Sequence, residues 1–238
     1  MRIAIIGYGK MGKEIETRAK ELGHEITHIF DVHNIEELKN LKSDETDVAI
    51  EFSRPDTAPD NIKTCLKNGI QIVTGTTGWN DSLEEITSYC KENNACLFYA
   101  SNFSIGMNIF FEINKILAKL MSSQQAYNAK MQETHHIHKL DAPSGTAVSL
   151  AMQIIENHPN YVKWVLNNDE SISNLPIFAF REGEVPGDHS VKWDSEWDNI
   201  TISHSAKNRK GFVNGAIMAA EFVIGKTGVY QMKDLLNL

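Results

Sequence analysis

The feature that most constrains this chain is a glycine-rich turn directly after its first apolar segment. Met1 to Gly7 (MRIAIIG) has the pattern of a buried β-strand, and apolar residues at helical spacing follow from Met11 to Leu22. The turn reads Gly7-Tyr8-Gly9-Lys10-Met11-Gly12, a GxGxxG motif in the strand–turn–helix setting that gives it meaning. We therefore expect a Rossmann-like unit that binds a dinucleotide here.

The residues of this turn have separate physical roles. Gly7 permits a tight turn, Gly9 lets the backbone approach a pyrophosphate, and Gly12 lets helix and strand pack closely. The start of the helix offers unpaired N–H groups and a partial positive charge to the phosphates. Asp31 ends the second predicted strand, where a carboxylate would bind the adenosine ribose and repel a 2′-phosphate. The alternative, that these glycines form an ordinary turn with no ligand, explains fewer of these features.

Strand and helix patterns alternate through the first hundred residues, which predicts an α/β fold with a doubly wound parallel sheet. After Asn102 the pattern changes, and we expect a smaller α+β domain with an open sheet. The dinucleotide-binding domain is expected over residues 1–104, completed by a C-terminal helix within 212–238, and the second domain over 105–211. Expected strands are 25–30, 47–52, 71–73, 96–99, 127–134, 177–181, 189–193 and 199–204; expected helices are 60–68, 81–93, 105–121, 147–156 and 216–224.

Composition excludes several classes of protein. The net charge is −8 and no run of Lys and Arg is present, so nucleic acid is not expected as a partner. Cys65, Cys90 and Cys96 are odd in number and fit no metal-ligand or CxxC spacing, which favours a reducing compartment such as the cytoplasm. No stretch approaches about 18 consecutive apolar residues, so no membrane segment is expected.

The most informative segment runs from Glu133 to Thr146 (ETHHIHKLDAPSGT), with three histidines within four residues. Zinc is one alternative, because imidazole is a common zinc ligand. Adjacent histidines on an extended chain point to opposite faces, no Cys accompanies them, and Lys139 would repel a cation. We therefore expect no metal at this segment.

An anion site fits the same segment better. The backbone N–H groups of Gly145 and Thr146 precede a predicted helix and would be free to bind a carboxylate, and His136 and Lys139 could hold a second one. His135 suits proton transfer, and Lys139 could supply a proton or neutralise developing charge. A solvated polar loop with a helix cap is the structural alternative.

With these residues in view, the sequence resembles the dihydrodipicolinate reductases, also called 4-hydroxy-tetrahydrodipicolinate reductases, over essentially its whole length. The segments that carry the resemblance are Gly75-Thr76-Thr77-Gly78, Asn102-Phe103-Ser104-Ile105-Gly106 and the His135-to-Thr146 block, in the family's order. The resemblance implies NAD(P)H-dependent reduction of a cyclic imine dicarboxylate to tetrahydrodipicolinate, with release of water, in lysine and diaminopimelate biosynthesis. It also implies a homotetramer with subunit contacts through the second domain.

The resemblance assigns roles to particular residues. His135 is implied as proton donor or acceptor and Lys139 as proton donor, while His136, Gly145 and Thr146 are implied to bind the substrate carboxylates. The residues implied to line the cofactor are Gly7, Tyr8, Gly9, Lys10, Met11, Gly12, Asp31, Gly75, Thr76, Thr77, Ala100, Ser101, Asn102 and Phe103.

Three departures from the family pattern matter. The glycine turn is one residue shorter than the usual GxxGxxG, which should leave cofactor binding intact. Asp31 is followed by Val32 and His33 where NADPH-competent relatives can carry an arginine, so NADH is expected to be preferred, with NADPH accepted and Lys10 as a weak phosphate contact. Ile137 stands where the family often has an arginine.

Other functions fit the residues less well. A semialdehyde dehydrogenase needs a reactive cysteine, and the tandem histidines do not suit the neutral polyol of a sugar or inositol dehydrogenase. A non-catalytic NADH-binding sensor would have no need of His135 and Lys139. The sequence leaves the roles of His189, His204 and Arg209 open.

Overall fold

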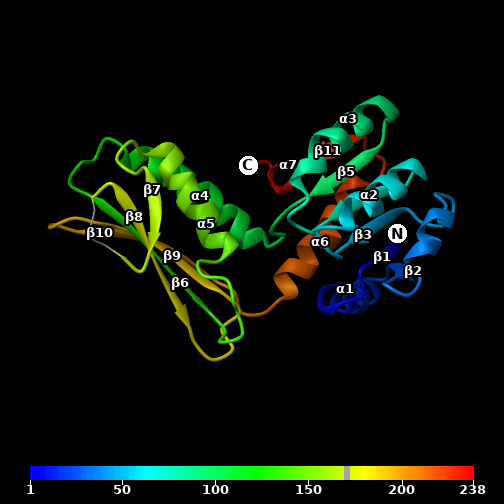
Figure 1. The fold of residues 1–238 in the computed structure, drawn as a ribbon, viewed down its shortest axis with the longest axis horizontal. Coiled ribbons are helices and arrows are strands. Elements are labelled where there is room, and N and C mark those ends of the chain that lie inside the picture. The colour runs from blue at the N-terminus through cyan, green and yellow to red at the C-terminus, as the bar shows by residue number, and fades with distance from the viewer. Residues whose placement is uncertain (169–171) are drawn as a thin grey trace. The chain divides into compact units, whose positions relative to one another are not determined.

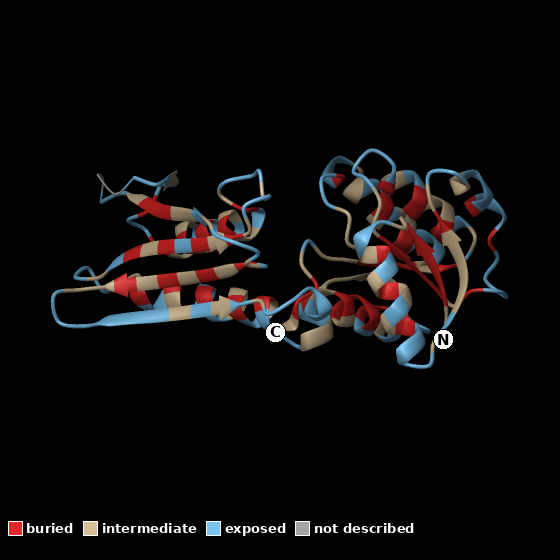
Figure 2. Ribbon diagram, turned by 90° about the horizontal axis from the view of Figure 1, so that it is seen from below, coloured by how far each residue is buried: buried red, intermediate tan, exposed pale blue. Residues whose placement is uncertain are grey.

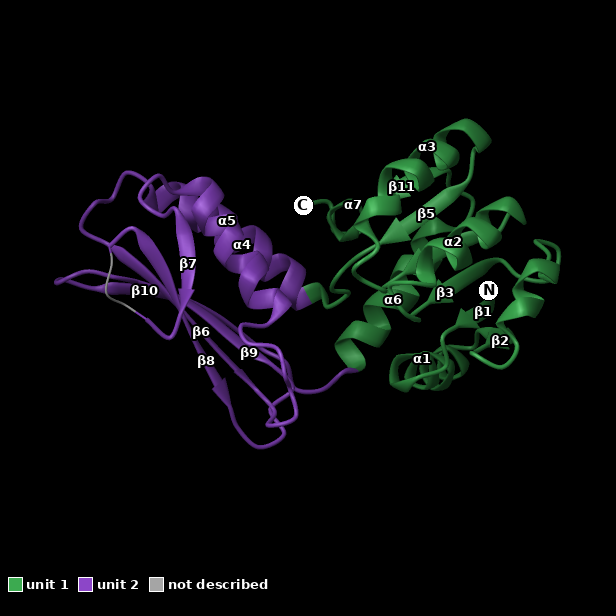
Figure 3. Ribbon diagram, in the orientation of Figure 1, with its two compact units in different colours: residues 1–105, 210–238 green, residues 106–209 purple. Residues whose placement is uncertain are grey.

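The chain forms two compact units in the computed structural model, which describes residues 1–168 and 172–238 (Figures 1 and 3). Unit 1 contains residues 1–105 and 210–238, and unit 2 contains residues 106–209. Throughout these described ranges, every helix is too short or too polar to cross a bilayer.

Unit 1 is built on a six-stranded sheet in which every pairing is parallel, as predicted. The strand order is β11-β5-β4-β3-β1-β2. The short apolar strands suit a parallel sheet because both faces of such a sheet are covered by helices. The strands are β1 (Arg2–Ile6), β2 (Glu25–Phe30), β3 (Val48–Glu51), β4 (Gln71–Thr74), β5 (Cys96–Tyr99) and β11 (Gly228–Tyr230).

Helices cover both faces of this sheet, so two apolar cores form (Figure 2). Ile3 and Ile5 of β1 face one core and Ala4 and Ile6 face the other, because successive side chains of a strand alternate between faces. The first core packs against α1 (Lys10–Glu21), α6 (Lys210–Val223) and α7 (Met232–Leu236); the second packs against η1 (Ile35–Asn40), α2 (Ala58–Lys67) and α3 (Leu83–Asn93), and η2 (Asn80–Ser82) precedes α3.

The C-terminal segment differs from the single helix expected within 212–238. α6 begins at Lys210, and a chain reversal through Gly225, whose φ is +73°, leads into strand β11 and then α7. β11 extends the sheet by pairing with β5. α6 also lies closer to its neighbours than sequence could show, since a β-carbon on Gly215 would be 1.9 Å from the carbonyl oxygen of Phe103.

Unit 2 contains a mixed five-stranded sheet in the order β10-β9-β6-β8-β7. β6 is its central strand, antiparallel to β9 and parallel to β8. Residues on one face of the sheet, such as Met131 and Trp193, form a core with α4 and α5. The elements are α4 (Ile105–Met121), β6 (Asn128–His135), α5 (Gly145–Asn157), β7 (Lys163–Leu166), β8 (Asn174–Arg181), β9 (Asp188–Asp194) and β10 (Asn199–Ser205).

Two features of unit 2 depart from the sequence expectation. β7 and the first residues of β8 were not expected. β7 has only four residues, and β8 begins with Asn174 and Pro176, which are poor strand formers. α5 begins at Gly145 rather than Ala147. Ser144 caps it, since the Ser144 hydroxyl accepts a hydrogen bond from the Ala147 N–H at 3.2 Å.

Candidate active site

Unit 1 has an open pocket of about 380 Å³ beside the glycine turn, at the carboxyl ends of β1, β3 and β4. Ligands of open parallel sheets bind at this edge. The pocket therefore lies where the sequence predicts the cofactor. Its lining residues are Gly9, Lys10, Met11, Phe52, Ser53, Pro55, Gly75, Thr76 and Thr77.

The turn is packed on two sides and open at its centre. A β-carbon on Gly7 would lie 2.0 Å from the carbonyl oxygen of Phe52, and one on Gly12 would lie 2.2 Å from the carbonyl oxygen of Gly7. A β-carbon on Gly9 would meet nothing within 4 Å. Gly9 precedes α1 and no side chain caps the helix. The first N–H groups of α1 can therefore donate hydrogen bonds to an anion. This arrangement fits a dinucleotide pyrophosphate.

Asp31 follows β2 directly and lies beside the glycine turn. The backbone of the two strands is joined there, because the Gly7 N–H donates to the carbonyl oxygen of Phe30 at 2.8 Å. The Asp31 carboxylate accepts a hydrogen bond from the His33 N–H at 2.8 Å, and the Asn34 side chain accepts one from the Asp31 N–H. The carboxylate is thus held in place at the end of the strand.

Sequence reasoning missed Glu51, a fully buried carboxylate at the end of β3. It accepts hydrogen bonds from the Ser53 N–H at 2.9 Å and the Thr76 hydroxyl at 3.0 Å, and from the hydroxyls of Ser53 and Thr74. These bonds join the two loops that line the pocket after β3 and β4. The loops also touch at Gly75, where a β-carbon would overlap the Phe52 ring.

Other predicted cofactor residues have structural contacts of their own. The Tyr8 hydroxyl donates to Glu16 on α1, so it is turned along the helix. The Phe103 side chain is 2% exposed and packs on Phe98 in the core. Ala100 is half-buried, Ser101 is exposed, and Asn102 accepts a hydrogen bond from the Ser104 N–H at 2.9 Å.

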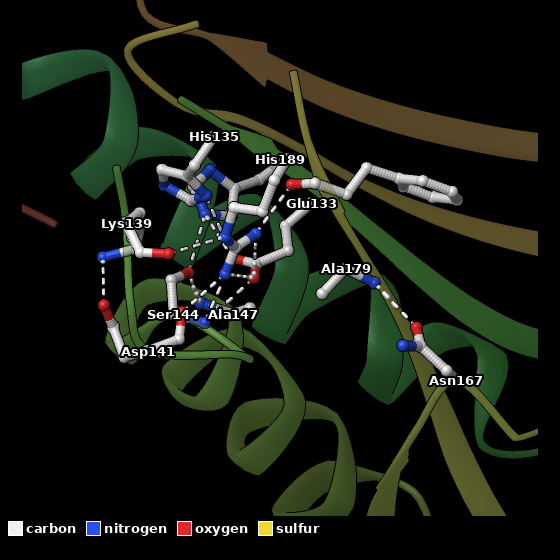
Figure 4. Close-up of polar contacts among 11 residues, drawn as sticks. Glu133, His135, Lys139, Asp141, Ser144, Ala147, Asn167, Ala179 and His189 are labelled. Carbon is white, nitrogen blue, oxygen red and sulfur yellow. Dashed lines mark hydrogen bonds and ion pairs between the residues drawn. The ribbon is translucent and has the colours of Figure 1, made fainter. Parts of the chain in front are cut away.

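Unit 2 carries a second polar cluster at the carboxyl end of its central strand β6 (Figure 4). Glu133 and His135 point to the same face of the sheet because they are two residues apart. Strand register brings two further side chains to them: Glu133 lies opposite His189 of β9, and His135 lies opposite Arg181 of β8. The apolar core of this face therefore ends in a charged group.

Glu133 is the centre of this cluster and is fully buried. The Ser144 N–H donates to both carboxylate oxygens at 3.1 Å, the Arg181 guanidinium lies 3.3 Å from Oε1, and His135 Nδ1 lies 3.3 Å from Oε2. Burial alone would raise the pKa of Glu133. The contact with the His135 ring and the hydrogen bonds from Ser144 outweigh burial and lower the pKa of Glu133 to about 2, so the carboxylate is charged.

The structure places two of the three residues whose roles were open. His189 is buried and packs edge-on against the His135 ring, with ring centroids 5.0 Å apart. Burial and then the charge of His135 lower the pKa of His189 to about 4, so this ring is neutral near pH 7. The His204 ring lies beside the Phe110 ring of the same unit, with ring centroids 6.3 Å apart. The Arg209 side chain is exposed.

The loop after β6 and the start of α5 carry the remaining predicted substrate residues. The Lys139 ammonium pairs with Asp141 at 2.9 Å and its side chain is 24% exposed. His136 is half-buried and its ring lies 6.0 Å from that of His138. Gly145 and Thr146 form the first turn of α5, and a β-carbon on Gly145 would meet nothing within 4 Å.

Comparison with known proteins shows the family of the chain. The family model for the N-terminus of dihydrodipicolinate reductase matches residues 1–103, and the model for its C-terminus matches residues 106–236. The chain belongs to the dihydrodipicolinate reductase family.

Proteins named 4-hydroxy-tetrahydrodipicolinate reductase match almost the whole chain. The 4-hydroxy-tetrahydrodipicolinate reductase of Christiangramia forsetii is 45% identical over 237 residues, covering 100% of this chain and 98% of that protein. The 4-hydroxy-tetrahydrodipicolinate reductase of Methanocaldococcus jannaschii is 35% identical, and the match covers 98% of this chain and 81% of that protein. A dipicolinate-bound dihydrodipicolinate reductase structure from Paenisporosarcina sp. TG-14 has a TM-score of 0.79 at 25% identity and covers 97% of each chain.

Membership of the dihydrodipicolinate reductase family fits a nicotinamide cofactor, and the cysteines of the chain do not suit thiol chemistry. All three cysteines are buried, and burial raises the pKa of each thiol, to about 11 for Cys90 and about 12 for Cys96. A reactive thiol needs the opposite environment. The semialdehyde dehydrogenase alternative is therefore excluded.

The structure suggests a different set of possible zinc ligands from the tandem histidines considered in the sequence. Among the described residues, the group that could surround a metal ion is Glu133, His135 and His189, with ligand atoms within 4.8 Å of one another. The Arg181 guanidinium already lies 3.3 Å from the carboxylate. Because a cation is in place, we interpret the group as a buried ion-pair network of the reductase family fold.

A sequence signal for part of this network existed. Glu133 precedes His135 by two residues, and period-two alternation puts both on one face of a strand. No comparable signal points to Arg181 or His189. These two residues lie 48 and 56 positions after Glu133 in the sequence. Only the strand order brings them to Glu133.

Proposed function

We propose that this protein is a 4-hydroxy-tetrahydrodipicolinate reductase that uses NAD(P)H to reduce a cyclic imine dicarboxylate, releasing tetrahydrodipicolinate and water. The observation that carries the proposal is the cluster of unit 2, where His135, Lys139 and the start of α5 offer a proton donor beside groups that bind carboxylates. A similar structure is bound to dipicolinate, itself a dicarboxylate, which supports this class of substrate.

The residues of this chain would divide the work as follows. The Gly145 and Thr146 N–H groups bind one substrate carboxylate at the positive end of α5. His136 and the Lys139 ammonium bind the other, which fixes the ring against rotation. The bound cofactor supplies a hydride, and the reaction also consumes one proton.

His135 and Lys139 provide that proton. His135 Nε2 lies beside Gly187, where a β-carbon would come within 3.0 Å of it, so the missing side chain leaves room at this nitrogen. A proton leaves Nε2 of the doubly protonated His135 ring, or the Lys139 ammonium, as electron density develops on the substrate, and solvent then reprotonates that residue. Lys139 also neutralises negative charge on the substrate during the reaction.

For the cofactor we propose a preference for NADH, with NADPH accepted. The residues that would hold it are the glycine turn 7–12, Asp31, the loop 75–77 and the segment 100–103. Asp31 would accept hydrogen bonds from the ribose hydroxyls and repel a 2′-phosphate. Lys10, which is exposed at the start of α1, would offset part of that repulsion.

We also propose a homotetramer with contacts through the sheet of unit 2. Phe180 on β8 is 49% exposed although it is large and apolar. It alternates with residues that face α4 and α5, so it lies on the uncovered face of the sheet. Light scattering after size-exclusion chromatography would report a mass near four chains, and a monomer would contradict this assembly.

The experiment that tests the activity follows consumption of NADH, and separately of NADPH, by the purified protein. The substrate is generated in the same cuvette by condensing pyruvate with aspartate semialdehyde. Substrate-dependent oxidation, faster with NADH, would support both the reaction and the role of Asp31. Cofactor binding without turnover would indicate a non-catalytic sensor instead.

A further inference from the structure

Glu133 presents an energetic problem that the proposed reaction does not by itself explain. A fully buried carboxylate loses several kcal/mol of hydration, which its partners must offset. Those partners are the Ser144 N–H, the Arg181 guanidinium and the His135 ring. All three lie in or beside the proposed substrate site. The free-energy cost of burying Glu133 therefore arises where the positions of the proposed catalytic groups matter most.

Arg181 connects Glu133 to the loop that carries Lys139. Its Nε donates to the carbonyl oxygen of Lys139 at 3.2 Å, and its Nη2 donates to the carbonyl oxygen of Asp141. Its Nη1 donates to the carbonyl oxygen of Phe180 at 2.7 Å. One guanidinium therefore fixes the end of β8, the Lys139 loop and the Glu133 carboxylate relative to one another.

The two nitrogens of the His135 ring have different surroundings. Nδ1 is buried and lies 3.3 Å from Glu133 Oε2, an ion-pair contact without hydrogen-bond geometry, whereas Nε2 lies beside Gly187. The His189 ring packs against His135 at an interplanar angle of 77°, which restricts rotation of the ring. A carboxylate at Nδ1 favours a proton on that nitrogen and leaves Nε2 to exchange protons with a ligand.

We propose that Glu133 and Arg181 are positioning residues: Glu133 selects the tautomer and orientation of His135, and Arg181 holds Glu133 and the Lys139 loop in one arrangement. This inference rests on the proposed function. Among the described residues, the charged and titratable groups beside His135 are Glu133 on β6, Arg181 on β8 and His189 on β9, and Lys139 lies in the loop that Arg181 holds.

The first test is independent of activity. Nitrogen-15 NMR of the imidazole rings, with the His135 signals assigned from their loss in His135→Gln, should show neutral His135 protonated at Nδ1. In Glu133→Gln, Arg181 selects the amide oxygen, so the amide NH₂ faces His135 Nδ1 and the proton should move to Nε2. The same tautomer in both proteins, or Nε2 protonation in the natural protein, would overturn the proposal.

The second test uses steady-state kinetics. Glu133→Gln should lower kcat by about 100-fold, the range of a misplaced proton donor, with substrate KM and NADH affinity changed less than about threefold. Glu182→Gln removes the same charge from an exposed neighbouring side chain and should match the natural protein. A raised KM with unchanged kcat would mean that Glu133 serves binding alone.

Glu133→Gln leaves the half-buried Arg181 guanidinium without its carboxylate partner, which can lower stability. The double variant Glu133→Gln/Arg181→Gln removes both charges and should restore stability, while kcat stays low because no carboxylate lies beside His135 Nδ1. If the natural protein shows no turnover, the proposed function fails. The tautomer measurement still decides whether Glu133 orients His135.

Discussion

Gly12 packs so closely on the Gly7 carbonyl oxygen that a β-carbon at position 12 would lie 2.2 Å from it. The contact joins the first turn of α1 to the end of β1 through backbone atoms. Gly9, between them, has open space where its β-carbon would be. The same motif therefore contains one glycine required for packing and one that leaves room for a ligand.

This difference predicts opposite results for two alanine substitutions. Gly12→Ala should lower stability by about 1–3 kcal/mol, because backbone must shift to make room, and Tm should fall by roughly 2–4 °C for each kcal/mol. Gly9→Ala should leave Tm nearly unchanged and weaken NADH binding by about tenfold or more, because the added methyl group occupies space needed by the phosphates. Calorimetry and nicotinamide fluorescence titration measure the two effects. Equal Tm values for the two variants would contradict the packing argument.

Asp31 should control the choice of cofactor. Asp31→Asn keeps an oxygen for the His33 N–H and removes the charge. NADPH affinity should rise relative to NADH by about tenfold, or ~1.4 kcal/mol, because a 2′-phosphate is no longer repelled. Parallel titrations with both cofactors test this, with exposed Asp56→Asn as the matched charge control. An unaltered ratio of the two dissociation constants would count against the ribose role.

His135 and Lys139 should be needed for turnover and not for NADH binding. His135→Gln and Lys139→Ala should each reduce kcat by roughly 10²–10⁴-fold, since each removes a proton donor. NADH affinity should stay within about twofold, because neither residue belongs to the glycine turn. His138→Gln is the control, since His138 lies in the same loop with 70% of its side chain exposed. Lost NADH binding in either active-site variant would refute this division of roles.

His189 should make unit 2 less stable in mild acid. Its pKa is lowered to about 4 from an ordinary value near 6.5, first by burial, so the unfolded chain binds more protons between these values. The stability contributed by neutral His189 is complete above about pH 6.5 and is lost as pH falls toward 4. His189→Asn should flatten the fall of Tm with pH in this window, and exposed His33→Asn should not. Thermal melts between pH 4 and 8, monitored by tryptophan fluorescence, would show the difference; equal slopes would contradict it.

Several elements were predictable because their causes are local. The β1–turn–α1 segment was predicted because a continuous apolar run, glycines and a helix start all lie within about twenty neighbouring positions. The parallel sheet of unit 1 was confirmed because strands separated by helices can pair in few other ways. β11 was missed because a three-residue strand has no periodicity of its own and exists only by pairing with β5.

For the proposed active site, the sequence alone determined which chemical groups are available: a glycine turn proposed for phosphates, Asp31 proposed for a ribose, and His135, Lys139 and a helix start proposed for an anionic substrate. The tertiary structure decided what surrounds those groups. Glu133 meets His189 and Arg181 because β6 lies between β9 and β8, an order set by packing of whole strands on α4 and α5. Side chains that distant in sequence have no local preference for one another, so their contact depends on the burial of the sheet as a whole.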